Sequence, residues 1–163
     1  MRQKNRLARA RRFDRILVLC LGNICRSPYG AGRLAGLARE GDSLTVRSAG
    51  LMGPGRPSPD AARSAALRRG LDLGPHESQL LSAELADWAD LFIVMSPHQA
   101  RVLRKSFGIS DSQIVLLGDL DPKPAGQREI PDPLDRSEDF FMETYDRMDR
   151  CLGELFALIR DPS

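Results

Sequence analysis

Cysteine is scarce in this chain, because only three occur among 163 residues, and two of these, Cys20 and Cys25, are near neighbours. A small, odd number of cysteines excludes the disulfide framework that stabilises many small secreted domains. A thiol that reacts as a nucleophile also needs a reducing environment. We therefore expect a cytoplasmic protein with reduced cysteines.

Charge of one sign and long apolar runs are also lacking. The net charge of +2 predicts no nucleic acid or other large polyanion as a partner. No apolar run approaches the roughly 20 residues of a membrane-spanning helix, so we expect no membrane partner. Residues 1–14 are an exception to the even charge distribution, because they contain six basic side chains and no apolar core. They predict a basic, disordered N-terminal arm ahead of one domain over residues 15–163.

The most informative stretch is residues 15–28, which predicts a strand, a tight loop and a helix start. The apolar run that ends at Cys20 predicts a buried strand. Ser27 followed by Pro28 predicts a helix with Ser27 as its N-cap. A loop between a strand and a helix start gathers backbone N–H groups into an anion-binding nest. The residues of this loop are Leu21, Gly22, Asn23, Ile24, Cys25 and Arg26.

Cys20 and Arg26 stand at the two ends of this loop. The positive end of a helix favours the thiolate form of a cysteine, which is the nucleophile. An arginine fork binds two phosphate oxygens at once. Alone, a buried cysteine is usually a small core residue and an arginine a solvated helix end. Together at this spacing they predict a nucleophile and a charge clamp for a tetrahedral dianion.

The pattern Cys-x5-Arg-Ser-Pro at residues 20–28 resembles the loop of the low-molecular-weight protein tyrosine phosphatase family. The resemblance extends over residues 15–159. It implies hydrolysis of phosphotyrosine in a protein or peptide through a phosphocysteine on Cys20, with no cofactor and no metal. Its other marks occur in the family's order, at Ser48-Ala49-Gly50, His76, Leu116-Leu117-Gly118 and Pro131-Asp132-Pro133.

The fold class follows from strands that alternate with helical patterns. We expect strands at 15–20, 44–48, 91–95 and 114–117, and helices at 28–40, 60–69, 82–88, 96–107 and 137–159. This alternation predicts a single α/β domain whose parallel sheet carries helices on both faces. The resemblance implies a four-stranded sheet in the order 2-1-3-4. Ligands of such sheets bind beyond the carboxyl ends of the strands, where the Cys20 loop lies.

A general acid must protonate the leaving oxygen. The resemblance assigns this role to Asp132, which lies between two prolines. Asp119, Asp121 and Asp135 lie in or beside the same loop, and an Asp-Pro pair alone is usually a surface turn. The choice of Asp132 rests on its order along the chain.

Four residues resemble the side chains that support the family's loop. Asn23 is expected to fix the loop from inside, and Ser27 to donate a hydrogen bond to the Cys20 sulfur. Ser48 and His76 are expected on the Asn23 side of the loop. The simpler interpretation makes Asn23 a turn residue and His76 a surface residue.

The substrate pocket is expected to be less aromatic than is usual in the family. Leu51 and Met52 stand where an aromatic residue often follows Ser-Ala-Gly, and Leu134 and Asp135 stand where tyrosines often follow Asp-Pro. Cys25 is a candidate redox partner that could form a reversible disulfide with the nucleophile. Its simpler role is loop packing.

Three other activities stay open as alternatives. An arsenate reductase of the same fold needs two further redox cysteines, and none occurs between Cys25 and Cys151. A protein-arginine phosphatase usually has threonine where Ile24 stands, so a phosphotyrosine substrate is favoured over phosphoarginine. A non-catalytic phosphate-binding module would not need an intact nucleophile, arginine and acid. The physiological substrate and the oligomeric state cannot be read from the sequence.

Overall fold

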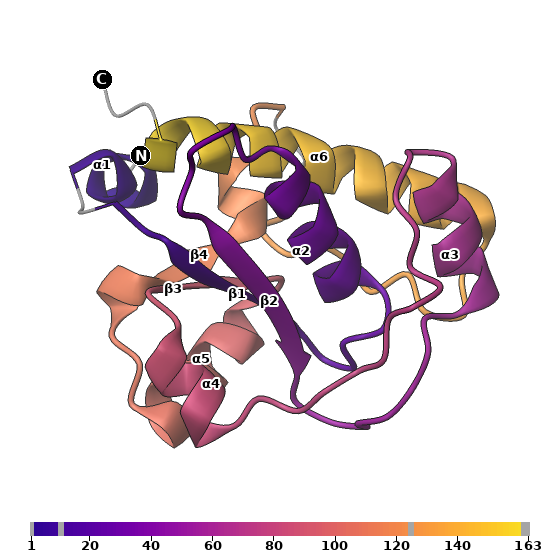
Figure 1. The fold of residues 1–163 in the computed structure, drawn as a ribbon, viewed down its shortest axis with the longest axis horizontal. Coiled ribbons are helices and arrows are strands. Elements are labelled where there is room, and N and C mark those ends of the chain that lie inside the picture. The colour runs from indigo at the N-terminus through magenta and orange to yellow at the C-terminus, as the bar shows by residue number, and fades with distance from the viewer. Residues whose placement is uncertain (1, 10–11, 124–125, 161–163) are drawn as a thin grey trace.

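The computed structural model describes residues 2–9, 12–123 and 126–160 and centres on one parallel sheet (Figure 1). The predicted strand order is confirmed, since the strands run β2-β1-β3-β4 with every pair parallel. The predicted α/β class is confirmed with it. The four strands are β1 (Arg15–Cys20), β2 (Thr45–Gly50), β3 (Leu91–Val94) and β4 (Ile114–Leu116).

Helices cover both faces of the sheet, as the alternation predicts (Figure 1). One face carries α2 (Arg26–Gly36), α3 (Asp60–Leu67) and α6 (Glu138–Arg160), and the other carries α4 (Ala83–Trp88) and α5 (Pro97–Phe107). Two short 3₁₀ helices, Asp111–Gln113 and Leu117–Leu120, flank β4. Within the described residues, no helix combines the length and apolar composition that crossing a bilayer requires.

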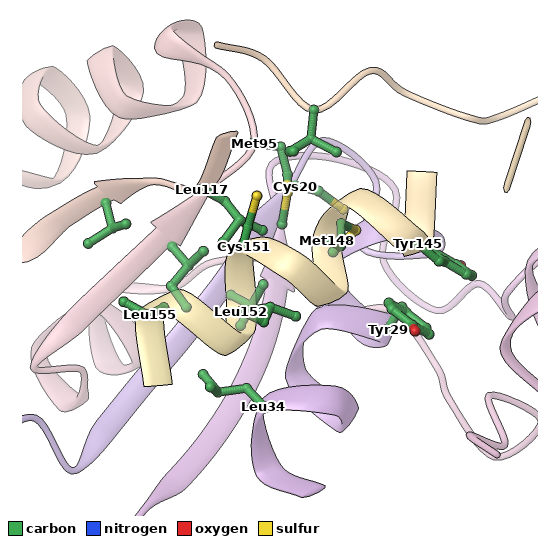
Figure 2. Packing of buried hydrophobic residues seen from close by; sticks show 14 of the residues in the cluster. Cys20, Tyr29, Leu34, Met95, Leu117, Tyr145, Met148, Cys151, Leu152 and Leu155 are labelled. Carbon is green, nitrogen blue, oxygen red and sulfur yellow. The ribbon is translucent and has the colours of Figure 1, made fainter. Parts of the chain in front are cut away.

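The alternation of side chains along β1 places Cys20. Ile16, Val18 and Cys20 face the core beneath α2 and α6, whereas Leu17 and Leu19 face the core beneath α4 and α5. Figure 2 shows Cys20 at the edge of the first core, which α6 closes with a row of apolar side chains. The nucleophile candidate therefore ends a strand that is buried from Ile16 onward. Ligands of such sheets bind beyond the carboxyl ends of the strands, which is where Cys20 lies.

Of the serines at three predicted helix starts, two are N-caps and one is not. Ser82 and Ser96 are N-caps, and each side chain accepts a hydrogen bond from the backbone N–H three residues later. The prediction that Ser27 is an N-cap is wrong. The helix begins two residues earlier with Cys25 as its cap, and the Ser27 hydroxyl faces the loop and bonds to Asn23 instead.

The prediction of a disordered N-terminal arm is wrong for α1 (Arg2–Arg9). Leu7 is buried in the core shared with α6. The Gln3 side chain donates to the Leu116 carbonyl and accepts from the Leu116 N–H, and Arg6 donates to the Ile114 carbonyl. β4 is an edge strand with unpaired backbone groups, and α1 satisfies them. Residues 10 and 11 lie outside the described residues.

Candidate active site

The loop between β1 and α2 is organised around the buried Asn23 side chain. Its Nδ2 donates to Ser27 Oγ (2.7 Å) and Ser48 Oγ (2.9 Å), and its Oδ1 accepts from the Gln79 N–H (2.9 Å). The Asn23 carbonyl oxygen lies 2.6 Å from His76 Nε2. The structure thus brings together the four supporting residues that the sequence grouped. Gln79 was missed; besides its backbone N–H, its side-chain Nε2 donates to the Ser48 carbonyl (2.9 Å).

Asn23 adopts φ of 54°, a left-handed conformation that asparagine tolerates better than most residues. The adjacent end of β2 comes so close that a Cβ on Gly50 would lie 3.0 Å from the Asn23 nitrogen. Any side chain at Gly50 would therefore collide with the loop, which explains the glycine in Ser48-Ala49-Gly50. The Leu21 carbonyl accepts from the Leu51 N–H at 2.8 Å and fixes the two segments together.

Cys20 and Arg26 both point into the cavity that this loop encloses. Cys20 is buried, and its Sγ lies 3.0 Å from Ser27 Oγ. Arg26 is also buried and donates from Nη1 to the Ile130 carbonyl (2.9 Å). Its Nη2 lies 3.4 Å from Asp132 Oδ2. The thiol, the guanidinium and one carboxyl group therefore meet at one site.

Asp132 is the one aspartate of the four candidates that lines this cavity. Its side chain is 41% exposed, and its Oδ1 accepts from the Leu134 N–H at 3.1 Å. Asp119 forms an ion pair with Arg128 (2.7 Å) and Asp121 one with Arg147 (3.1 Å), both outside the cavity. Asp135 is exposed at a left-handed turn with φ of 61° and also lies outside the lining.

The cavity measures about 180 Å³ and has a mainly aliphatic wall. Of the four predicted wall residues, Met52 and Leu134 line it. Leu51 was wrongly assigned to the wall, because its side chain packs against the core beneath α4 and α5. Asp135 likewise does not line the cavity. The Leu21 side chain does, although the sequence suggested only its backbone.

Arg56 is a second guanidinium in the cavity wall that the sequence did not single out. Its Nε donates to the Gly53 carbonyl (2.8 Å), and its Nη2 lies 3.4 Å from the Gly22 carbonyl. Arg56 belongs to the loop after β2. The glycines and prolines of this loop give no periodic pattern from which the direction of the Arg56 side chain could be predicted. The cavity therefore has cationic groups on two sides.

Cys25 and Cys151 are both buried and free. Burial raises the pKa of the Cys25 thiol to about 12, and the negative charges of Asp132 and Cys20 add to this effect. Burial likewise raises the pKa of Cys151 to about 12 within the α6 core. In the described part of the chain, no group of three His, Cys, Asp or Glu side chains is placed to hold a metal ion.

Comparison with known proteins finds one family. A model described as low molecular weight phosphotyrosine protein phosphatase matches residues 15–162. A low molecular weight protein-tyrosine-phosphatase, Wzb, from Salmonella typhi is 39% identical over 139 residues, or 85% of this chain and 89% of the relative. A protein-arginine-phosphatase from Bacillus subtilis is 30% identical over 143 residues, or 86% and 93%. The solved structure of Vibrio vulnificus Wzb in complex with benzylphosphonate has a TM-score of 0.75 at 32% identity and covers 86% of this chain and 95% of that one.

Proposed function

The chain belongs to the low molecular weight phosphotyrosine protein phosphatase family, and on that premise we propose that it hydrolyses phosphotyrosine in proteins with Cys20 as nucleophile and Asp132 as general acid. The observation that supports these roles is the meeting of Cys20, Arg26 and Asp132 in one cavity. The other three candidates for the acid, Asp119, Asp121 and Asp135, do not line this cavity. Phosphoarginine stays a second candidate substrate, because a protein-arginine-phosphatase is among the relatives.

In the first step the Cys20 thiolate attacks phosphorus, and the bond from phosphorus to the tyrosine oxygen breaks. The backbone N–H groups of residues 21–26 and the Arg26 guanidinium hold the other three oxygens and stabilise charge in the transition state. Arg26 Nε is buried with no partner in the described part of the chain, so it is available for a phosphate oxygen. Asp132 gives its proton to the leaving phenoxide.

In the second step water attacks phosphocysteine, and the sulfur–phosphorus bond breaks. The Asp132 carboxylate accepts a proton from water, which restores the acid for the next cycle. The Ser27 hydroxyl, 3.0 Å from the Cys20 sulfur, donates to the departing thiolate. Its contacts with Asn23 and Cys20 explain why this serine faces the loop rather than caps the helix.

The pocket wall favours a flat aryl ester over a guanidinium. Ile24 presents a branched apolar side chain that offers no acceptor for guanidinium N–H groups, and Arg56 repels a cation. We expect kcat/KM on a phosphotyrosine peptide to exceed that on a matched phosphoarginine peptide by about tenfold or more. Ile24→Thr should reduce this ratio, whereas Ile24→Val should not. Equal rates of the unsubstituted enzyme on both peptides would exclude this basis for selectivity.

We further propose a cytoplasmic location and a reversible oxidation of the nucleophile. Peroxide oxidises the Cys20 thiolate to sulfenic acid, and the Cys25 thiol then displaces water to form a disulfide. Because the pKa of Cys25 is raised to about 12, its thiolate fraction and hence the rate of closure should rise as pH increases from 7 to 9.

The test of this oxidation is recovery of activity by thiol after peroxide treatment. Cys25→Ala should recover less than the unsubstituted enzyme, because sulfenic acid that is not captured is oxidised irreversibly. Cys151→Ala is the matched control, since it removes a thiol that is equally buried but lies on α6. Equal recovery of all three proteins would show that Cys25 does not protect Cys20 from irreversible oxidation.

A further inference from the structure

Arg147 is a buried arginine of α6 that the proposed reaction does not use. Its side chain faces the acid loop, which is here residues 118–123 and 126–133 and ends next to Asp132. Its Nη2 donates to the Gln127 carbonyl (2.6 Å) and its Nη1 to the Glu129 carbonyl (2.7 Å). Its Nε pairs with Asp121 Oδ2 at 3.1 Å. One guanidinium therefore holds both the beginning and the end of this loop.

Asp121 binds Arg147 through a buried ion pair. The side chain is 3% exposed and is also held by Arg150 (3.1 Å) and by the Lys123 N–H (3.0 Å). Burial alone would raise the pKa of Asp121, but the hydrogen bonds from Arg150, Lys123 and Arg147 lower it below its ordinary value. The carboxylate thus stays charged at neutral pH. A buried charge is costly without its partners, so loop and helix stay together.

Ile130 and Pro131 connect the segment that Arg147 binds to Asp132, and both residues are themselves restrained. The Ile130 N–H donates to the Met95 carbonyl at the end of β3 (2.9 Å), and the Ile130 carbonyl accepts from Arg26 (2.9 Å). Pro131 then fixes one backbone angle before Asp132. Only two residues, Ile130 and Pro131, separate the last carbonyl that Arg147 holds from the acid, and both are restrained.

We propose that Arg147 is a positioning residue of the acid step, which anchors the acid loop so that the Asp132 carboxyl group reaches the leaving oxygen. The inference rests on the proposed role of Asp132. Proton transfer needs the donor within hydrogen-bond reach, and a displacement of about 1 Å can cost about 10²-fold in rate. Arg147 acts through the backbone of the loop and does not touch the substrate.

The test compares kcat/KM for a series of aryl phosphates with leaving groups of increasing basicity. Arg147→Met keeps an unbranched apolar stem but removes the guanidinium with its donors and charge. We expect it to lower kcat/KM about tenfold or more on the most basic leaving group, and less than about threefold on an activated one that departs unprotonated. The dependence of rate on leaving group should therefore become steeper.

Arg160→Met is a matched control on the same helix. Arg160 has a side chain that is 3% exposed, donates to the Phe13 carbonyl (2.8 Å) and pairs with Asp14 (3.4 Å), so its loss should destabilise the fold in a similar way. Among the described residues, its hydrogen bonds and ion pairs go to Phe13, Asp14 and Asp42, none of which belongs to the acid loop. Its substitution should leave the leaving-group dependence unchanged, whatever it does to the melting temperature.

A double-mutant cycle with Asp132→Asn separates positioning from general damage. If Arg147 acts through the acid, Arg147→Met should cause no further loss of kcat/KM in the Asp132→Asn background. A loss that is equal for all leaving groups and persists in that background would overturn the proposal. If Arg147→Met does not fold, Arg150→Met, which loosens the same Asp121 anchor, must show the same pattern at smaller size. A failure of the proposed function is distinct, because Asp132→Asn itself would then leave the leaving-group dependence unchanged.

Discussion

Replacing Cys20 with serine is expected to lower the hydrolysis of an aryl phosphate by a factor on the order of 10⁴ or more. The serine hydroxyl is a far weaker nucleophile than a thiolate at neutral pH. The loop N–H groups and Arg26 stay in place, so binding of inorganic phosphate should survive. Steady-state kinetics, a melting curve and calorimetric titration with phosphate test the three parts separately.

Cys151→Ser is the matched control, because it makes the same change at a buried thiol of α6. It should retain turnover within a few-fold of the unsubstituted enzyme, about the size of effect expected of a change outside the site. Substantial turnover by Cys20→Ser in a folded protein would remove Cys20 from the nucleophile role. Loss of phosphate binding together with activity would instead point to a collapsed loop.

Asp132→Asn is expected to lower kcat/KM on a basic leaving group by about 10²-fold or more, and much less on an activated one. Asparagine keeps the shape of the side chain but has no proton to give. A series of substituted aryl phosphates measured at one pH shows this difference.

Asp135→Asn is the control for Asp132, because it removes a charge three residues away on the same loop. Asp135 is exposed and does not line the cavity, so its loss should change kcat/KM by less than about threefold at any leaving group. The opposite result, with a steeper leaving-group dependence in Asp135→Asn and an unchanged one in Asp132→Asn, would reverse the assignment.

The fold and the nucleophile loop could be predicted because their information is local in the sequence. Apolar runs alternate with helical patterns, and the loop from Cys20 to Arg26 is contiguous, so its residues are brought together by a single turn. The supporting residues Ser48 and His76 come from distant segments, and only the family resemblance indicated them. Their contacts with Asn23 bring them into the same network.

The features that were missed depend on tertiary contacts that leave no pattern in the sequence. A buried arginine such as Arg147 has the same letter as a solvated one, and its partners are mostly backbone carbonyls. Arg56 comes from a loop without periodicity. Residues 2–9 contain one apolar side chain that becomes buried, Leu7, so their docking on an edge strand could not be inferred from composition.

In the proposed mechanism the phosphoryl group is transferred to Cys20 before it reaches water. The direct measurement is a rapid quench of the enzyme with an activated aryl phosphate, followed by mass spectrometry of the peptide that contains Cys20. Asp132→Asn should accumulate the intermediate, since the first step needs no acid with this substrate and the second lacks its base. We expect one phosphoryl group on Cys20 and a stoichiometric burst of leaving group. Turnover without any phosphorylated Cys20, or a phosphoryl group on another residue, would contradict the mechanism.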